Sequence, residues 1–370
     1  MKRSQDEKFM SLALRLARLG AGSVSPNPMV GAVLVKSGEV VATGYHRAFA
    51  LAHAEVEALQ KVGFRAKGMD LYVNLEPCCH YGNTPPCTDA IIRAGVKRVI
   101  VGTVDKNPMV SGRGIAKLRE AGVEVEVGVL EAQASKLNEG FFKWVTTGLP
   151  FVTLKLAITL DGKIADRNLV SRWISSPESR RLVHKLRAVS DCIMVGAGTF
   201  RADNPTLLPV EVSSLRKTPI RTVISSKGDI AVSDETNLLR TKDKGKIVLA
   251  CAEGVDKERI KALNLLGFEV WVVKEKDGGV DMKELLKVMG DKGLVYVLVE
   301  GGARLSASLL AEDLVDKLIL FVAPKLLCDP HAVPMVTDLG IRTLSQTKGF
   351  TVEAVKKVGQ DVMLTLTTES

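Results

Sequence analysis

One histidine and two cysteines in this chain have the spacing of a metal site. His53-Ala54-Glu55 is followed, after a strand-like segment, by Pro77-Cys78 and then by Pro86-Cys87. A catalytic zinc ion takes three nitrogen or sulfur ligands and keeps one position open, and His53, Cys78 and Cys87 supply that set. Because Glu55 follows His53 by two residues at the start of a helical pattern, its carboxylate is expected near the metal without binding it.

This arrangement predicts the hydrolytic removal of an amino group from a base. Zinc lowers the pKa of its bound water to about 7, which provides a hydroxide at neutral pH. The hydroxide attacks a ring carbon that carries an amino group, and Glu55 moves the proton of the water to the departing ammonia. We therefore interpret the first half of the chain as a zinc-dependent deaminase that acts on an amino-pyrimidine.

The identity of the two sulfur ligands has an alternative. Eight residues separate Cys78 from Cys87, whereas two separate the cysteines of the commonest deaminase pattern, so Cys79 or His80 remains open as a ligand. The prolines before Cys78 and Cys87 favour these two, because they preset the chain at helix starts, where backbone N–H groups favour a thiolate. The alternatives to a catalytic site are a structural zinc site, or a buried histidine with two unrelated cysteines. We expect the three remaining cysteines to be buried apolar residues: Cys192, Cys251 and Cys328.

The first half of the chain alternates helical and strand-like patterns, which favours an α/β sheet covered on both faces. Ser4 to Glu7 has a capping-box pattern, which predicts a helix that starts there and stops at Gly20. Ser37-Gly38 predicts a hairpin between two strands. The expected strands are 29–35, 40–45, 70–75, 96–104 and 123–129, and the expected helices are 53–62, 87–94, 116–121 and 131–147.

The second half begins a new α/β series after Gly148-Leu149-Pro150, so we expect two domains, 1–147 and 148–370. Val195 to Thr199 and Val299 to Ala303 are glycine-rich strand ends, and a helix that begins after glycines is a natural phosphate site. Asp161-Gly162 fits a type I′ hairpin turn. The expected strands are 151–158, 191–195, 220–225, 246–251, 268–273 and 294–300, the expected helices are 177–187, 255–265 and 282–289, and 317–324 and 350–366 are expected to be β-rich.

Composition restricts the partners of the chain. Of 370 residues, 46% are hydrophobic and 25% are charged, and the formal net charge is +9. Such a charge suits a nucleic acid or a small anionic substrate, but aromatic residues make up only 5%, so platforms for base stacking are scarce. We expect a small phosphorylated pyrimidine as substrate, with no nucleic acid and no membrane partner. We expect neither a secretory signal nor a membrane-spanning segment. We also expect a cytoplasmic homo-oligomer.

Several longer motifs resemble the bifunctional deaminase/reductase family of bacterial riboflavin biosynthesis. In the first half these are Ser25-Pro26-Asn27-Pro28-Met29-Val30-Gly31, Gly44-Tyr45-His46, His53-Ala54-Glu55 and the segment from Leu75 to Cys87. In the second half they are Thr159-Leu160-Asp161-Gly162-Lys163, Ser171-Arg172-Trp173-Ile174, Asp203-Asn204-Pro205 and Val299-Glu300-Gly301-Gly302. The resemblance covers nearly the whole chain in order. It implies a cytidine-deaminase-like three-layer domain followed by a dihydrofolate-reductase-like α/β domain.

The resemblance also implies two consecutive reactions. The first removes the 2-amino group from 2,5-diamino-6-ribosylamino-4(3H)-pyrimidinone 5′-phosphate, and the second uses NADPH to reduce the ribosyl group to a ribityl chain. It implies substrate contacts at Asn27 and His46 in the deaminase, and at Lys155, Ser171, Arg187, Leu207 and Glu300 in the reductase. It implies NADPH contacts at Ala157, Trp173, Thr199, Asp203, Ser225 (or Ser226), Gly302, Ala303, Arg304, Leu305, Ser306, Ala307 and Ser308.

Three places depart from the family pattern. Phe49 to Ala52 replaces a segment that usually holds a glycine and a proline, and Asn83 stands where an arginine or lysine is usual. After Leu207 the family usually shows Thr-x-Arg, but this chain has Leu208-Pro209-Val210, so an expected anchor for the substrate phosphate is missing. Arg201 or Arg216 is a candidate replacement.

A rival interpretation keeps the zinc chemistry and changes the substrate. The chain would then be a nucleic-acid deaminase acting on tRNA, and its second half a binding module. The basic charge motivates this alternative, while the glycine-rich strand ends and the scarcity of aromatic residues speak against it.

Overall fold

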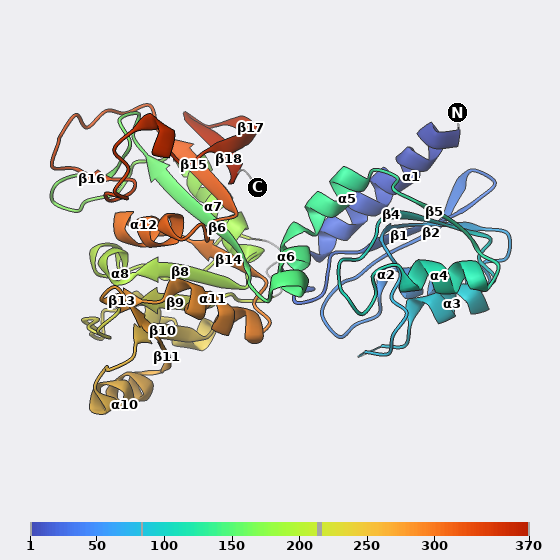
Figure 1. The fold of residues 1–370 in the computed structure, drawn as a ribbon, viewed down its shortest axis with the longest axis horizontal. Coiled ribbons are helices and arrows are strands. Elements are labelled where there is room, and N and C mark those ends of the chain that lie inside the picture. The colour runs from blue at the N-terminus through green and yellow to red at the C-terminus, as the bar shows by residue number, and fades with distance from the viewer. Residues whose placement is uncertain (1, 83, 213–216, 369–370) are drawn as a thin grey trace. The chain divides into compact units, whose positions relative to one another are not determined.

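The chain forms two compact units, Met1–Leu149 and Pro150–Ser370 (Figure 1). The computed structural model describes residues 2–82, 84–212 and 217–368. Asn83 and Arg216, which the sequence analysis discusses, lie outside the described residues. Within the described part of the chain, no helix has both the length and the apolar character that crossing a bilayer requires.

The first unit contains a five-stranded sheet in the order β2-β1-β3-β4-β5. β1 pairs antiparallel with β2 and β3, and β3, β4 and β5 run parallel. Ser37 and Gly38 both have positive φ, of 51° and 82°, as the tight turn of the predicted hairpin requires. The strands are β1 (Gly31–Lys36), β2 (Glu39–Tyr45), β3 (Asp70–Leu75), β4 (Arg98–Thr103) and β5 (Glu124–Val127).

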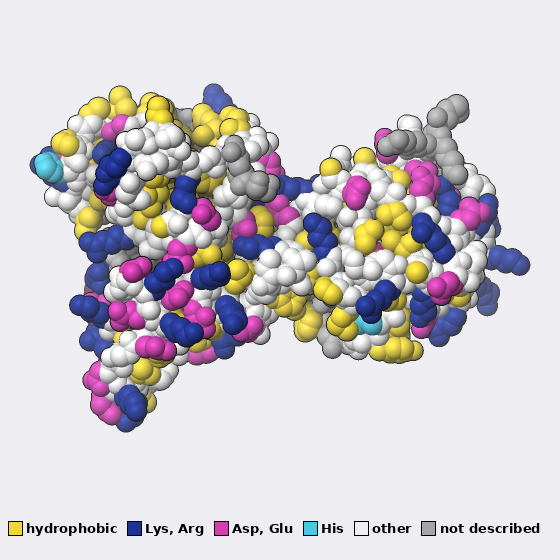
Figure 2. Space-filling view, in the orientation of Figure 1, with side chains coloured by type: hydrophobic (Ala, Val, Ile, Leu, Met, Phe, Trp, Pro, Cys, Tyr) yellow, Lys and Arg dark blue, Asp and Glu magenta, His cyan; other side chains and the backbone are white. Residues whose placement is uncertain are grey.

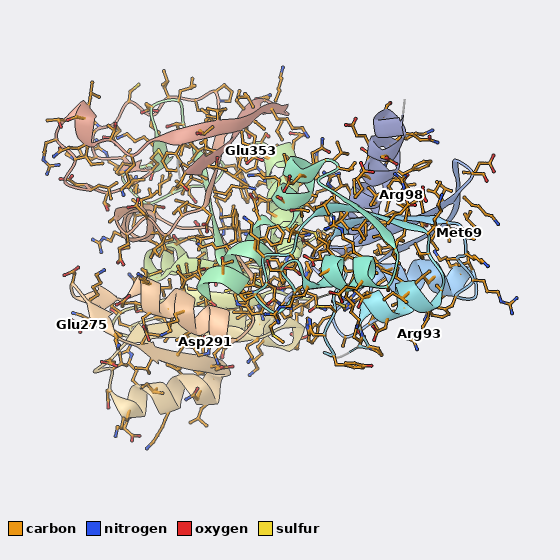
Figure 3. All side chains as sticks on the ribbon, turned by 45° about the vertical axis from the view of Figure 1, so that its right-hand side comes forward. Met69, Arg93, Arg98, Glu275, Asp291 and Glu353 are labelled. Atoms are coloured by element: carbon orange, nitrogen blue, oxygen red, sulfur yellow. The ribbon has the colours of Figure 1, made fainter. Side chains whose placement is uncertain are left out.

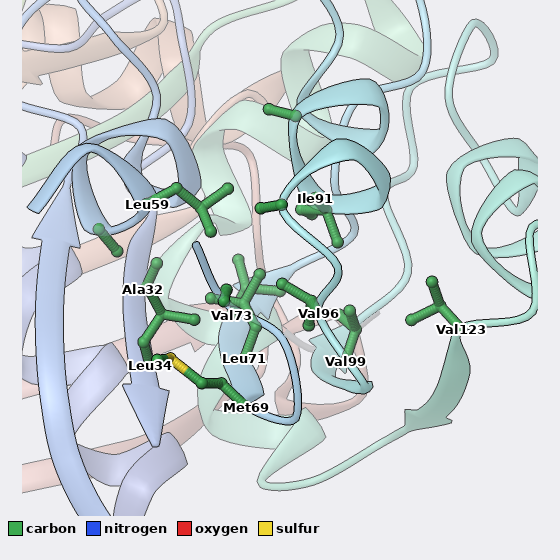
Figure 4. Packing of buried hydrophobic residues seen from close by; sticks show 14 of the residues in the cluster. Ala32, Leu34, Leu59, Met69, Leu71, Val73, Ile91, Val96, Val99 and Val123 are labelled. Atoms are coloured by element: carbon green, nitrogen blue, oxygen red, sulfur yellow. The ribbon is translucent and has the colours of Figure 1, made fainter. Parts of the chain in front are cut away.

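Helices cover both faces of this sheet. Met10 and Leu14 of α1 and Ala134 of α5 pack on one face, and Leu59 of α2 and Ile91 of α3 pack on the other (Figure 4). The predicted two-sided cover is therefore confirmed. The helices are α1 (Lys2–Ala17), η1 (Arg18–Gly20), α2 (Ala54–Lys61), α3 (Cys87–Arg93), α4 (Arg113–Glu120), α5 (Glu131–Leu137) and α6 (Glu139–Thr147).

Two local predictions in this unit are wrong. Ser4 lies inside α1, which begins at Lys2, so Ser4 does not cap the helix. The single helix predicted over 131–147 is interrupted at Asn138, which separates α5 from α6. The Asn138 side chain accepts a hydrogen bond from Met29 N at 2.8 Å and donates one to Met29 O at 3.0 Å. These hydrogen bonds to a distant segment fix Asn138 between the two helices, although the helical pattern alone would continue through it.

A buried ionic cluster ties α1 to the sheet of the first unit. Arg98, at the start of β4 (Figure 3), is bonded to Asp6 at 2.8 Å and to Asp70 at 3.0 Å. Tyr72 donates a hydrogen bond to the same Asp6 carboxylate at 2.5 Å. Arg98 and Asp6 are both buried. A charge removed from water is costly unless it is paired, and these bonds give each of the two charges a partner.

The second unit is built on a nine-stranded sheet in the order β11-β10-β9-β8-β14-β6-β15-β18-β17. The strands from β11 to β15 are parallel, and β18 and β17 form an antiparallel hairpin at one edge. The strands are β6 (Phe151–Ile158), β8 (Cys192–Gly196), β9 (Ile220–Ile224), β10 (Ile247–Ala252), β11 (Phe268–Val273), β14 (Tyr296–Val299), β15 (Lys317–Val322), β17 (Phe350–Val358) and β18 (Asp361–Thr368). Two small sheets pair β7 (Lys163–Ala165) with β16 (Val333–Pro334), and β12 (Glu275–Lys276) with β13 (Gly279–Val280).

Because the strands from β11 to β15 are parallel, their carboxyl ends lie along one edge of the sheet. Helices follow most of these strands. In open α/β sheets, ligands bind outside this edge, where the strand order changes direction. The helices are α7 (Pro177–Ala188), α8 (Ala197–Asp203), α9 (Asn237–Arg240), α10 (Lys257–Leu266), α11 (Met282–Asp291) and α12 (Ala303–Ala311), with short 3₁₀ turns η2 (Lys242–Lys244) and η3 (Leu344–Gln346). Val183 of α7 packs against Ile319 and Phe321 of β15.

Two further predictions are wrong in this unit. Gly162 N donates to Thr159 O, so Leu160 and Asp161 are the central residues of the turn. Neither has a positive φ, which excludes type I′, and only Gly162 enters the left-handed region, with φ 73°. Cys328 is exposed, whereas Cys192 and Cys251 are buried as predicted.

Candidate active sites

His53, Cys78 and Cys87 come together at the starts of two helices. His53 precedes the first residue of α2, and Cys87 is the first residue of α3. His53 Nδ1 lies 3.2 Å from Cys87 Sγ and 3.5 Å from Cys78 Sγ. Bonds of about 2.0 to 2.3 Å to a tetrahedral zinc ion place such ligand atoms about 3.5 Å apart. Among the described residues, these three form the one group of potential metal ligands, with all ligand atoms within 4.8 Å of one another.

The alternative ligands lie outside this group. Cys79 Sγ faces Met109 O, at 4.0 Å, and His80 Nδ1 is buried without a partner among the described residues. The geometry thus favours Cys78 and Cys87 as the sulfur donors. A hydrogen bond from Cys87 outweighs burial and, together with His53, lowers the pKa of Cys78 to about 4.

Glu55 is buried beside this cluster. Its exposed fraction is 3%, and Oε2 has no hydrogen-bond partner among the described residues. Burial raises the pKa of Glu55 above the ordinary value of a carboxyl. A buried polar atom without a partner calls for a ligand or an ion to satisfy it. The donor set, one nitrogen and two sulfurs, together with this carboxylate fits a catalytic zinc ion with one open position.

Asn27 and His46 line the same region. Asn27 Nδ2 lies 3.1 Å from His46 Nε2, and His46 Nδ1 lies 3.1 Å from Ala52 O. A carbonyl oxygen only accepts, so Nδ1 of His46 carries the proton and Nε2 accepts from Asn27. The His46 ring stands edge-on to His53, with centroids 5.2 Å apart. Burial lowers the pKa of His46, which keeps its ring neutral at neutral pH.

Glu76 is a supporting residue that the sequence analysis missed. Its carboxylate accepts hydrogen bonds from the backbone N–H groups of Gly112 and Gly114, both at 2.9 Å, and of Ile115 at 3.1 Å. These groups begin α4, where the helix dipole favours a negative charge. A side chain on Gly114 would place its Cβ 2.1 Å from Pro77 O. The contact between α4 and the segment that leads to Cys78 therefore depends on both residues.

In the second unit, Lys155, Arg187 and Glu300 gather at the carboxyl edge of the sheet. Arg187 binds Glu300 through two hydrogen bonds of 2.5 and 2.8 Å, with side chains 14% and 12% exposed. Burial opposes ionisation of Glu300, but the charge of Arg187 outweighs it and lowers the pKa of Glu300 to about 2. Burial lowers the pKa of Lys155, while the charge of Glu300 acts in the opposite direction.

A second group of predicted residues surrounds the starts of α8 and α12. Ser171 Oγ donates to Asp203 Oδ1 at 2.9 Å. A Cβ on Gly302 would lie 3.1 Å from Thr199 Oγ1, so the two helix starts are neighbours. Trp173 is 61% exposed, and the Arg180 guanidinium lies 4.2 Å from its ring centre. A glycine-lined helix start beside an exposed aromatic ring fits the phosphates and flat rings of NADPH.

Burial limits which atoms of several predicted residues can contact a ligand. Leu207 is 1% exposed and packs in the core, which leaves its backbone for contact. Leu305, Ser306 and Ala307 are buried in α12, whereas Arg304 and Ser308 are exposed. Ala157, Gly302 and Ala303 lie beside this region, on β6 and at the start of α12. Ser225 Oγ donates to Asp229 Oδ1 at 2.6 Å, and Arg201 donates to Asp229 O.

Comparisons with known proteins match both units. A family model described as the RibD C-terminal domain covers residues 150–364, and a model of the cytidine and deoxycytidylate deaminase zinc-binding region covers residues 3–103. The riboflavin biosynthesis protein RibD of Aquifex aeolicus is 41% identical over 98% of this chain and 99% of its own length. RibD of Escherichia coli is 38% identical over 98% of this chain and 99% of its own length.

Solved structures agree with these matches over the full length. RibD of Acinetobacter baumannii aligns with a TM-score of 0.87 and 34% identity, covering 100% of both chains. A diaminohydroxyphosphoribosylaminopyrimidine deaminase/5-amino-6-(5-phosphoribosylamino)uracil reductase from Thermotoga maritima aligns with the same TM-score of 0.87, 34% identity and 100% coverage. The fold and the two sites thus define a zinc-dependent deaminase joined to an NADPH-dependent reductase.

The chain belongs to the RibD family, and it is a bifunctional deaminase/reductase of riboflavin biosynthesis. This result favours the riboflavin-pathway prediction over the tRNA alternative. On the face seen in Figure 2, lysines and arginines are interspersed with acidic residues, whereas a nucleic-acid interface usually has a continuous basic stripe.

Proposed function

We propose that the unit Met1–Leu149 deaminates 2,5-diamino-6-ribosylamino-4(3H)-pyrimidinone 5′-phosphate, and that the unit Pro150–Ser370 reduces the ribosyl group of the product. These ranges differ by two residues from the predicted domains, 1–147 and 148–370. The observation that carries the first assignment is the cluster of His53, Cys78 and Cys87 beside the buried carboxylate of Glu55, whose Oε2 has no hydrogen-bond partner among the described residues.

In the deaminase, His53 Nδ1, Cys78 Sγ and Cys87 Sγ would hold zinc. When bound there, zinc supplies a Lewis acid that lowers the pKa of water. Glu55 takes a proton from the attacking water and delivers it to the departing amino group, so that the ring gains a carbonyl oxygen and releases ammonia. The raised pKa of Glu55 suits this role, because the group must both accept and give up a proton near neutral pH.

Asn27 and His46 would orient the pyrimidine ring. The Asn27 amide nitrogen is engaged by His46, so the amide oxygen of Asn27 is left to accept from a donor on the substrate. The neutral imidazole of His46, fixed by Ala52 O, holds Asn27 in that orientation. This pair therefore supports binding of a ring that presents amino or N–H groups.

In the reductase, Lys155, Ser171, Arg187, Glu300 and the backbone of Leu207 would contact the substrate. NADPH supplies the hydride, and the protein's part is to hold the two reactants close together and away from water. The Arg187–Glu300 pair fixes both side chains before the substrate arrives. The proposed NADPH contacts are Ala157, Trp173, Thr199, Asp203, Ser225 and the segment from Gly302 to Ser308.

We also propose a cytoplasmic homo-oligomer. Cys78 and Cys87 are free cysteines, and a reducing compartment keeps such residues available as metal ligands. The edge strand β17 exposes Val352 and Val355, by 57% and 64%, and such an edge offers a surface for a second copy.

The two assignments can be tested in a single assay series. The purified protein is given the diamino-pyrimidine phosphate with and without NADPH. We expect ammonia release without NADPH, and NADPH oxidation only once the deaminated product is present. NADPH oxidation that begins before any ammonia appears would contradict the order of the two steps, and the absence of ammonia would contradict the deaminase assignment.

A further inference from the structure

A basic groove in the second unit lies outside the residues assigned so far. Its volume is about 310 Å³, and it is formed by α7, the segment that carries Val210 and Glu211, and the end of β17. Four cationic residues belong to its lining: Arg181 and Lys185 from α7, and Lys356 and Lys357 from β17.

The lining of this groove has four cationic residues and two carboxylates, so cations are in excess. Glu178, one of its two lining carboxylates, is paired with Arg181 at 3.0 Å. Within the described residues, Lys185, Lys356 and Lys357 form no ion pair, and Glu211 is the remaining carboxylate of the lining. Cations held together in this way repel one another unless an anion joins them.

Buried polar contacts hold the walls of the groove in place. Asp361, 2% exposed, follows the turn after β17 and accepts hydrogen bonds from Ser176 N at 2.7 Å and Ser179 Oγ at 2.5 Å. Ser176 Oγ also donates to Val358 O at 3.3 Å. The start of α7 and the end of β17 are thereby joined, which fixes the two walls relative to each other.

The third wall connects the groove to the reductase site. Val210 N donates to His184 Nδ1 at 3.2 Å, and Arg187, which binds Glu300, donates to Leu208 O at 3.1 Å. One helix, α7, therefore carries residues of both the groove and the proposed substrate site. Val210 is the apolar residue of this wall, and it lines the same groove as the four cationic residues.

We propose that this groove binds the phosphate monoester of the substrate during the reduction, through Arg181, Lys185, Lys356 and Lys357. The proposal rests on the proposed reductase function, and it assigns the phosphate to cations from α7 and β17. A phosphate offers several acceptor oxygens, so it can engage cations from both walls at once.

The test uses the full-length protein and two reductase substrates, the deaminated pyrimidine with its phosphate and the same compound without it. In the double variant Lys185→Gln/Lys356→Gln, we expect the KM for the phosphorylated substrate to rise by about tenfold or more, as the loss of charged hydrogen bonds predicts. The KM for the dephosphorylated substrate should stay unchanged. Adding Val210→Arg to the double variant should recover part of the lost affinity, because it returns a cation to the same groove.

Lys287→Gln is the matched control, since Lys287 is an exposed lysine on another helix of this unit, α11. Equal effects on the two substrates, or no effect on either, would overturn the proposal. NADPH also carries a phosphate monoester, so the ratio of the KM values for NADPH and NADH is measured in parallel. A change in that ratio, with the substrate KM constant, would assign the groove to the cofactor and likewise overturn the proposal.

Failure of the reductase function itself gives a different result. A wild-type protein that does not oxidise NADPH with either substrate would contradict the proposed function. In that case, calorimetric titration with ribose 5-phosphate and with ribose still tests the groove. Binding of the phosphate ester that the double variant loses would support a phosphate site there, and equal binding by both proteins would exclude one.

Discussion

Glu55 and Glu57 stand two residues apart on α2 and yet have different surroundings. Glu57 accepts a hydrogen bond from Tyr45 N at 3.2 Å and pairs with Arg47, so its charge is satisfied within the protein. Glu55 is buried beside three residues of metal-ligand type, and its Oε2 has no hydrogen-bond partner in the part of the chain that the structure describes. The sequence predicts this position of Glu55, because the short motif itself places the carboxylate two residues after the proposed ligand His53.

Replacing Glu55 by Gln should stop proton transfer while keeping the size of the side chain. We expect deamination to fall by about 10² to 10⁴-fold, with one zinc ion per chain retained and reduction of the deaminated substrate unchanged. Ammonia release, elemental analysis and NADPH oxidation measure the three quantities. Glu57→Gln serves as the control and should deaminate at nearly the wild-type rate. A Glu55→Gln protein with near-normal ammonia release would refute the proposed proton transfer.

The Arg187–Glu300 pair predicts a pH dependence of stability in the second unit. The pKa of Glu300 is lowered to about 2 in the folded protein, so its stabilising effect is complete above the unfolded value, about 4.3. The effect is lost as the pH falls towards 2. At pH near 6, we expect the pair to make the unfolding free energy of the wild type about 3 kcal/mol higher than that of Glu300→Gln. At pH near 3.5, this difference should be smaller by about 1 to 2 kcal/mol.

Urea unfolding at the two pH values, followed by tryptophan fluorescence in a Trp144→Phe background, measures this difference. Trp173 and Trp271 then report on the second unit alone. Glu235→Gln, which removes an exposed carboxylate from the same unit, should show no comparable narrowing. A constant difference between wild type and Glu300→Gln over this pH range would mean that the pair does not lower the pKa of Glu300.

At the scale of helices and strands, most of the fold follows from the periodicity of the sequence. The strands β3 and β11 begin and end where the apolar pattern predicts. The interruption at Asn138 does not follow from the periodicity, because it depends on hydrogen bonds to Met29, a residue far away in the sequence. The type of the turn at Asp161 was predicted wrongly for a similar reason: the Asp161 carboxylate accepts from Leu327 N and Cys328 N, which belong to a distant loop.

The start of α4 depends on the Glu76 carboxylate, to which the sequence analysis assigned no role. Glu76→Gln removes the charge that accepts the N–H groups of Gly112, Gly114 and Ile115. We expect the unfolding free energy of the first unit to fall by about 1 to 3 kcal/mol. Thermal unfolding of the variant measures the change. Glu120→Gln, at the opposite end of α4, is the control and should lose less stability than Glu76→Gln. Equal losses in the two variants would contradict the role of Glu76 in holding the helix start.

On the scale of the whole molecule, two chemistries are carried by two separate units with their own cores. The deaminase ligands all belong to the first unit, and the proposed NADPH contacts all belong to the second. A sequence pattern predicted this division because the alternating elements begin anew after Pro150. The basic groove was beyond prediction, since α7 and β17 are far apart in the sequence and meet only through the folded sheet.

Removal of the metal should therefore affect one activity only. After exhaustive dialysis against a strong zinc chelator, we expect ammonia release to be lost and the thermal transition of the first unit to fall, because a bound ion stabilises the folded state. NADPH-dependent reduction of the deaminated substrate should continue at the rate of the untreated protein. Zinc added back should restore deamination. Loss of both activities together, with recovery of both on adding zinc, would contradict the division of chemistry between the units.

The position of β6 has a consequence for how the second unit is made in the cell. β6 is the first strand of this unit to be synthesised, yet both of its neighbours come late: Phe151 pairs with Tyr296 of β14, and Thr153 pairs with Lys317 of β15. At translation rates of about 5 to 20 residues per second, β6 waits on the order of ten seconds for them. During that time its apolar side chains have emerged from the ribosome without the two strands that flank β6 in the folded sheet.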